Sequence, residues 1–163
     1  MTIHPERHLK DLIADFSTAM MITHLNDNSV HARPMAIADM DVDGSLYFAT
    51  SIDSGKLREI EADPKVALTM QDSSVYISVW GNASLSTDRA LIDRLWSEPL
   101  KIWFPEGKED PSLVIIKIDP EHAEYWDNSG AKGIGFAVSA LTAYVRGEKL
   151  DQASPSQHAK VAL

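Results

Sequence analysis

The chain has 163 residues, the size of a single domain that buries about two thirds of its unfolded surface. Its 15 Lys and Arg against 24 Asp and Glu give a formal net charge of −9, so we expect neither nucleic acid nor an anionic membrane as a partner. The absence of cysteine excludes disulfides, thiolate metal sites and thiol nucleophiles. Residues 1–10 hold no apolar signal-peptide core, and no apolar run approaches the roughly 20 residues that cross a bilayer, so we expect a cytoplasmic protein.

The N-terminal part of the chain predicts a helix followed by three strands. The helix is indicated by apolar residues that recur at the spacing of one helical face, namely Leu9, Leu12, Ile13 and Phe16. Strands are expected at residues 20–25, 29–38 and 45–50, and the turn sequence Asp-Val-Asp-Gly at 41–44 joins the last two as a hairpin. Residues 54–60 then predict a helix with Ser54 as its N-cap.

The second half of the chain continues the alternation of strands and helices. Strands are expected at residues 65–70, 75–85, 113–118 and 122–127, a helix capped by Asp88 after the second of them, and a structured loop at 103–111. A last helix is expected at 132–146, and 147–163 is expected to be a flexible or packing tail. Six or seven short strands, mostly joined as hairpins, predict an antiparallel barrel with helices packed outside, in one domain over 1–163.

A candidate anion site combines two cations with several hydroxyls. Arg33 lies on the second expected strand, and Lys56 lies in the first turn of the helix at 54–60, close in sequence to Thr50, Ser51 and Ser54. Cations and hydroxyls at a helix N-terminus form a site suited to phosphate. In the alternative, Lys56 is an ordinary solvated residue and Arg33 pairs with a carboxylate.

Pro34 suggests that its strand lies at a sheet edge, because proline cannot donate a ladder hydrogen bond. Such an edge can present the backbone of residues 33–36 to a flat heterocycle, although an ordinary protected edge strand fits equally well. Trp80, Trp103 and Trp126 are candidates for stacking on an aromatic ligand, with packing in a core or interface as the alternative.

Other chemistries find no support in the sequence. The six histidines form no metal-binding pattern, so no metal site is expected. Neither a Gly-x-Ser-x-Gly elbow nor a Walker lysine loop is present, and no catalytic acid or base can be named.

A set of short motifs, in this order along the chain, resembles the pyridoxamine-phosphate-oxidase-like FMN-binding split barrels: HARPM at 31–35, GSLYFAT at 44–50, SGK at 54–56, DPKVAL at 63–68 and SVWGNA at 78–83. The later motifs WFPEG at 103–107 and EYWD at 124–127 are similar to the general stress protein branch of that superfamily.

The resemblance implies a mainly β fold of the α+β type, a six- to seven-stranded antiparallel split β-barrel with flanking helices. It also implies a homodimer with an FMN in each of two grooves at the interface. The implied phosphate ligands are Arg33, Lys56, Thr50, Ser51 and Ser54. The implied ring contacts are Pro34, Met35, Ala36, the backbone near Phe48 and Ala49, and Trp126, which the partner chain can supply.

The function expected from this resemblance is a flavin-dependent oxidoreductase with an unidentified small substrate, reduced by NAD(P)H or another small reductant. Two alternatives stay open: a non-catalytic FMN-binding stress protein or redox or light sensor, and a relative that binds haem or a deazaflavin. True pyridoxamine-phosphate oxidase activity is not expected, because those oxidases close with a C-terminal strand of basic residues and no arginine–histidine pair follows Arg146.

Overall fold

The computed structural model describes residues 4–130, 145 and 158–163. Three α-helices lie in this part: α1 (Pro5–Ala14), α2 (Gly55–Ala62) and α3 (Arg89–Leu95). Two 3-10 helices follow α3: η1 (Glu98–Ile102) and η2 (Gly107–Glu109). The strands are β1 (Thr18–His24), β2 (Val30–Ala36), β3 (Asp39–Met40), β4 (Leu46–Ser51), β5 (Lys65–Gln71), β6 (Val75–Ser86), β7 (Leu113–Asp127) and β8 (His158–Ala162). Within these residues no helix has the length and apolar character needed to span a membrane.

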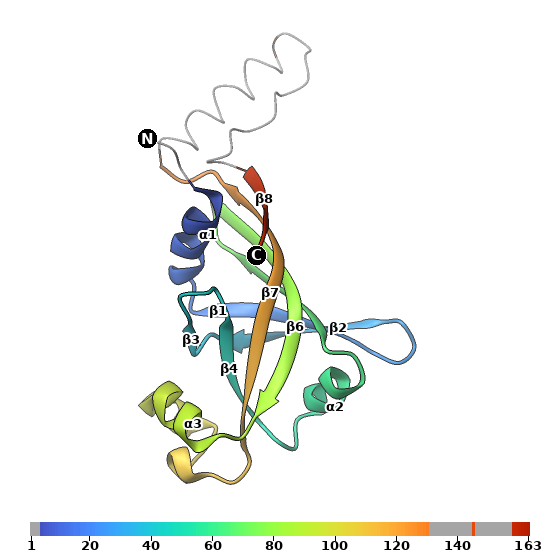
Figure 1. The fold of residues 1–163 in the computed structure, drawn as a ribbon, viewed down its shortest axis with the longest axis vertical. Helices are drawn as coiled ribbons and strands as arrows, with labels where there is room; N and C mark the ends of the chain where they lie inside the picture. Colours follow the sequence, from blue (N-terminus) through green and yellow to red (C-terminus); the bar gives the residue numbers. More distant parts are fainter. Residues whose placement is uncertain (1–3, 131–144, 146–157) are drawn as a thin grey trace.

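All the strands belong to one curled antiparallel sheet. Seven of them run in the order β2-β1-β5-β6-β7-β4-β3, and β8 pairs with β7 outside this path. The two longest strands, β6 and β7, lie side by side along the molecule, and the three helices lie outside the sheet (Figure 1). The expected mainly β, antiparallel split barrel with flanking helices is therefore confirmed.

The strand β7 corrects one prediction. The sequence predicted separate strands at 113–118 and 122–127, but Leu113–Asp127 is continuous. Pro120 lies opposite Gly81, where the register shifts between Trp80 and Gly81. A Cβ atom on Gly81 would lie 2.0 Å from the backbone oxygen of Asp119, so only glycine permits this approach. At this register shift Glu121 of β7 has no partner on β6, and such a bulge tolerates the missing N–H of the neighbouring proline, so the strand continues.

Two further differences concern strand ends. The strand expected at 29–38 ends at Ala36, and Asp39–Met40 forms the separate short strand β3 against β4. The end of the expected tail forms β8, which pairs with the second half of β7 and buries Val161. The chain thus has a C-terminal strand that the sequence analysis missed. The helix expected at 132–146 lies almost wholly outside the described residues.

Two hydrophobic clusters pack against opposite faces of β4. Phe48 and Ile116 belong to the large cluster inside the curled sheet. Tyr47 and Ile115 belong to a smaller cluster, where they pack with Ile92 of α3. Burial on both faces explains why residues 113–118 are apolar except for Lys117. It also fixes the end of β4, from which the chain leads directly into α2.

Candidate functional site

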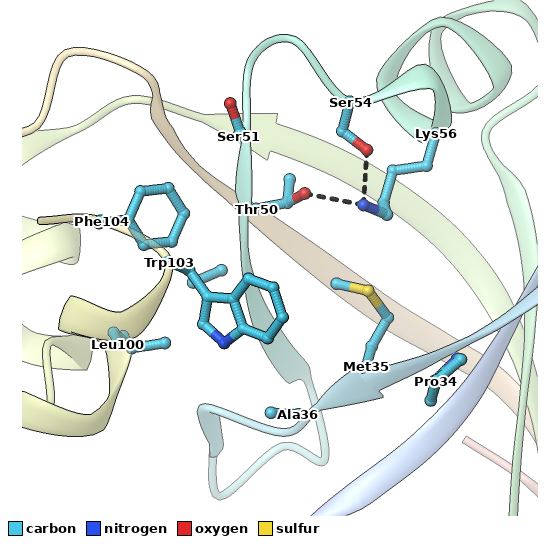
Figure 2. Close-up of a pocket in the computed structure, with 11 residues that line it drawn as sticks. Pro34, Met35, Ala36, Thr50, Ser51, Ser54, Lys56, Leu100, Trp103 and Phe104 are labelled. Carbon is cyan, nitrogen blue, oxygen red and sulfur yellow. Dashed lines mark hydrogen bonds between the residues drawn. The ribbon is translucent and has the colours of Figure 1, made fainter.

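A pocket of about 440 Å³ opens between β2, the end of β4, the start of α2 and the η1 region (Figure 2). Its lining residues are Pro34, Met35, Ala36, Ala49, Thr50, Ser51, Ser54, Lys56, Leu100, Trp103 and Phe104. Every lining residue from β2, β4 and the start of α2 was predicted for the site. Leu100 and Phe104 were not predicted, and Trp103 was named only as one of three candidates for stacking.

Lys56 forms the cationic end of the pocket. Its Nζ donates hydrogen bonds to Thr50 Oγ1 at 2.9 Å and to Ser54 Oγ at 2.5 Å, as Figure 2 shows. Burial lowers the pKa of Lys56, the positive charge of Arg33 lowers it further, and Glu59 acts in the opposite direction. Among the described residues no carboxylate lies within ion-pair distance of this amine.

The start of α2 adds backbone donors beside Lys56, although the N–H of Leu57 already donates to the backbone oxygen of Ser54 at 3.1 Å. Ser54 occupies the N-cap position, as the sequence predicted, but its side chain makes no capping hydrogen bond. It accepts from Lys56 instead. The N–H groups of the first turn therefore lack the usual side-chain partner, and the amine and the helix end together favour an anion.

Arg33 does not line the pocket. Its Nη2 donates to Glu59 Oε2 at 2.6 Å and to Thr23 Oγ1 at 2.9 Å. Its Nη1 is buried and has no hydrogen-bond partner in the part of the chain that the structure describes. The pairing with a carboxylate, considered as an alternative to a phosphate role, is thus present and still leaves one donor unused. An unsatisfied buried donor costs about 1–3 kcal/mol.

The other end of the pocket is apolar. Leu100 of η1 and the following Trp103 and Phe104 face Met35 and the end of β4 across the pocket (Figure 2). Phe104 is buried, whereas Trp103 is 77% exposed. The sequence indicated a structured loop here and named Trp103 only as one of three stacking candidates. Its position against β2 depends on how the α3–β7 connection folds back, which periodicity does not reveal.

The side chains of two further residues predicted for the site lie outside the pocket. Phe48 is completely buried in the large cluster, so its side chain does not line the pocket. Trp126 lies at the far end of β7, where its ring stacks on His158 with centroids 5.0 Å apart and 10° between the planes. A contact between Trp126 and a ligand held by a second chain stays a prediction.

Comparisons with known proteins agree with this architecture. Residues 4–151 match the family model described as pyridoxamine 5'-phosphate oxidase like. General stress protein 26 of Bacillus subtilis (strain 168) is 36% identical over 93 residues, which cover 54% of this chain and 65% of that protein. The crystal structure of the general stress protein 26 from Bacillus anthracis str. Sterne aligns with a TM-score of 0.68 and 32% identity, over 76% of this chain and 94% of that chain.

A second solved structure is of a protein that is named for flavin binding. The general stress FMN/FAD binding protein from Xanthomonas citri aligns with a TM-score of 0.65 and 30% identity, over 78% of this chain and 90% of that chain. The family model extends over most of the sequence, and solved structures of the same family share the fold. The chain belongs to the pyridoxamine 5'-phosphate oxidase-like family.

Proposed function

We propose that the chain binds FMN in this pocket as a homodimer and acts as a flavin-dependent oxidoreductase on a small substrate. The observation that carries the proposal is that one pocket has a cationic end and an apolar end. Lys56, without a carboxylate partner among the described residues, lies at one end, and the wall of Leu100, Trp103 and Phe104 lies at the other. A ligand with a phosphate and a planar apolar ring matches both ends. The Xanthomonas citri relative is a general stress FMN/FAD binding protein, which supports a flavin as the ligand.

The residues present fit the parts of FMN. Lys56, Thr50, Ser54 and the first N–H groups of α2 would hold the phosphate, and the unused Nη1 of Arg33 supplies a further donor nearby. Pro34, Met35 and Ala36 on the edge strand β2 would contact the ring system. A bound flavin supplies hydride and electron transfer, while these side chains bind it and exclude water around it.

An exposed apolar face of the sheet supports the homodimer. Met20, Tyr76, Trp80 and Trp126 are each between 37% and 43% exposed. Tyr76 pairs directly with Trp126, and Met20 pairs with Thr69, which in turn pairs with Ser78 between the two aromatic residues of β6. Directly paired residues share a face, so these side chains form one surface, and a second copy would cover it.

The dimer can be tested by placing a charge on this surface. We expect light scattering to give a dimer for the wild-type protein and a monomer, or a much weaker dimer, for Trp80→Glu. Val42→Glu is the matched control, because Val42 is 96% exposed in the turn between β3 and β4, away from this surface. A wild-type monomer in the presence of FMN would count against the homodimer.

A second function, FMN binding without turnover in a stress or sensor protein, is favoured by one observation. The residues that line the pocket include no histidine, aspartate or glutamate, so Lys56 is the one acid or base among them, and it is assigned to the phosphate. Reduction of the bound flavin separates the two functions. Rapid loss of visible flavin absorbance on mixing with NADH or NADPH, followed by turnover with an added acceptor, supports the oxidoreductase. A flavin that neither nucleotide reduces supports the sensor.

A further inference from the structure

A largely buried hydrogen-bond network joins three elements of the fold, β1, β2 and α2. Thr23 of β1 donates to Glu59 Oε2 of α2 at 2.5 Å, and Arg33 of β2 donates from Nη2 to that same carboxylate oxygen at 2.6 Å. The side chains of Arg33 and Glu59 are 14% and 13% exposed, and Thr23 is fully buried. Burial shields this ion pair from water and salt more than a surface pair, so it can fix a position.

Glu59 also lies on the helix that carries Lys56. The two residues are three positions apart on α2, so they share one face of the helix. Arg33 is close enough for its charge to lower the pKa of Lys56, after the larger effect of burial, while Glu59 raises it. Glu59 therefore connects the strand that carries one cation to the helix that carries the other.

The way in which Glu59 binds Arg33 leaves part of the guanidinium unused. Of the guanidinium nitrogens only Nη2 donates to the carboxylate, whose other oxygen lies 3.3 Å from His31 Nδ1. Nη1 of Arg33 is left buried and without an acceptor among the described side chains and backbone. A planar guanidinium has several donors in a fixed arrangement, so fixing one nitrogen also fixes the direction of the others.

We propose that Glu59 is a positioning residue for the flavin phosphate: it holds Arg33 by Nη2, fixes it relative to Lys56, and keeps Nη1 as a donor for the phosphate. This inference rests on the proposed binding of FMN. It differs from a role in which Glu59 only offsets the charge of Arg33, because in that case its removal would strengthen the attraction for phosphate.

The test compares FMN with riboflavin, which lacks the phosphate, by calorimetric titration of the full chain. We expect Glu59→Ala to weaken FMN binding about tenfold, the lower end for hydrogen bonds to charged groups, and to change riboflavin binding by less than about twofold. Glu59→Gln keeps an oxygen that can accept from Arg33 and should recover part of the loss. Glu61→Ala, on an exposed position of the same helix, should leave both affinities unchanged.

A double-mutant cycle then separates positioning from a general effect on the fold. If Glu59 acts through Arg33, Glu59→Ala should cause no further loss of FMN affinity in an Arg33→Ala background. Unchanged or tighter FMN binding by Glu59→Ala, or an equal loss for FMN and riboflavin, would overturn the proposal. If Glu59→Ala does not fold, Thr23→Val, which removes the hydroxyl bridging the pair, takes its place with the same expected selectivity for FMN. A wild-type chain that binds neither flavin would instead overturn the proposed function.

Discussion

The two ends of the pocket are built in opposite ways. The cationic end comes from residues close together in sequence, Thr50 to Lys56, where a buried strand leads straight into a helix. The apolar end comes from Leu100, Trp103 and Phe104, in a connection between α3 and β7 that folds back against β2 and β4. The first end rests on local geometry and charge, and the second rests on tertiary packing.

This difference suggests a division of roles. The amine, the hydroxyls and the helix start at the cationic end recognise a charge, so they should matter only for ligands that carry a phosphate. The wall at the other end presents carbon surface and an indole ring, so it should matter for any ligand with the same ring system. Ligands and substitutions that change one end at a time can therefore test the account.

The largest effect is expected at the cationic end. Lys56→Ala and Arg33→Ala should each weaken FMN binding by about 1.5–3 kcal/mol, the range for hydrogen bonds to charged groups. Riboflavin affinity should stay nearly constant in both variants, as measured by quenching of flavin fluorescence. If both variants keep the wild-type FMN affinity, the phosphate assignment is wrong.

A smaller effect is expected at the apolar end. Trp103→Ala should weaken FMN and riboflavin equally, by about 0.5–1.5 kcal/mol, because an aromatic pair contributes this much beyond its buried area. Ile102→Ala is the matched control, since Ile102 is 79% exposed and does not line the pocket. A loss confined to FMN, or an equal loss in the control, would break the division between the two ends.

The smallest and most gradual effect concerns pH. Burial, and then the charge of Arg33, lowers the pKa of Lys56 below its ordinary value of 10.5. As pH rises through this lowered pKa, Lys56 loses its proton in the flavin-free protein, so FMN affinity should fall before pH reaches the ordinary lysine value. Riboflavin affinity should not follow. Calorimetric titrations at a series of pH values measure both.

The stability of the flavin-free protein should change in the opposite direction over the same range. Between the lowered pKa of Lys56 and 10.5 the unfolded chain binds more protons than the folded chain, so this residue's contribution makes unfolding less favourable as pH rises. Urea unfolding of the wild type and of Lys56→Met isolates the contribution. A pH dependence of stability that is the same in both proteins would contradict the lowered pKa.

Local patterns in the sequence were enough for most of the fold and for one end of the site. The alternation on β6, the apolar face of α1 and the capping Asp88, which accepts from the backbone N–H of Leu91, all appear as expected. Thr50, Ser54 and Lys56 meet because only a short turn separates β4 from α2. In each case the interaction spans a few residues, and the residue types alone favour it.

Features that depend on distant segments were missed. Pro120 indicated a break in β7, but the strand continues because Gly81 of β6 lets the two backbones approach where the register shifts. Val161 is buried because β8 pairs with β7, so the sequence of residues 158–162 alone does not indicate a strand. Trp103 lies at the pocket because the connection between α3 and β7 folds back against β2. The sequence predicted a carboxylate partner for Arg33 as an alternative, but it could not identify Glu59 on α2 as that partner.

The central claim is that this pocket holds FMN, and the visible absorption spectrum of the purified chain tests it most directly. The protein would be mixed with FMN, desalted and measured beside Lys56→Ala treated in the same way. The account predicts flavin bands that stay with the wild-type protein and are diminished in the variant. A wild-type protein that leaves the column without flavin bands, even after saturation with FMN, would contradict it.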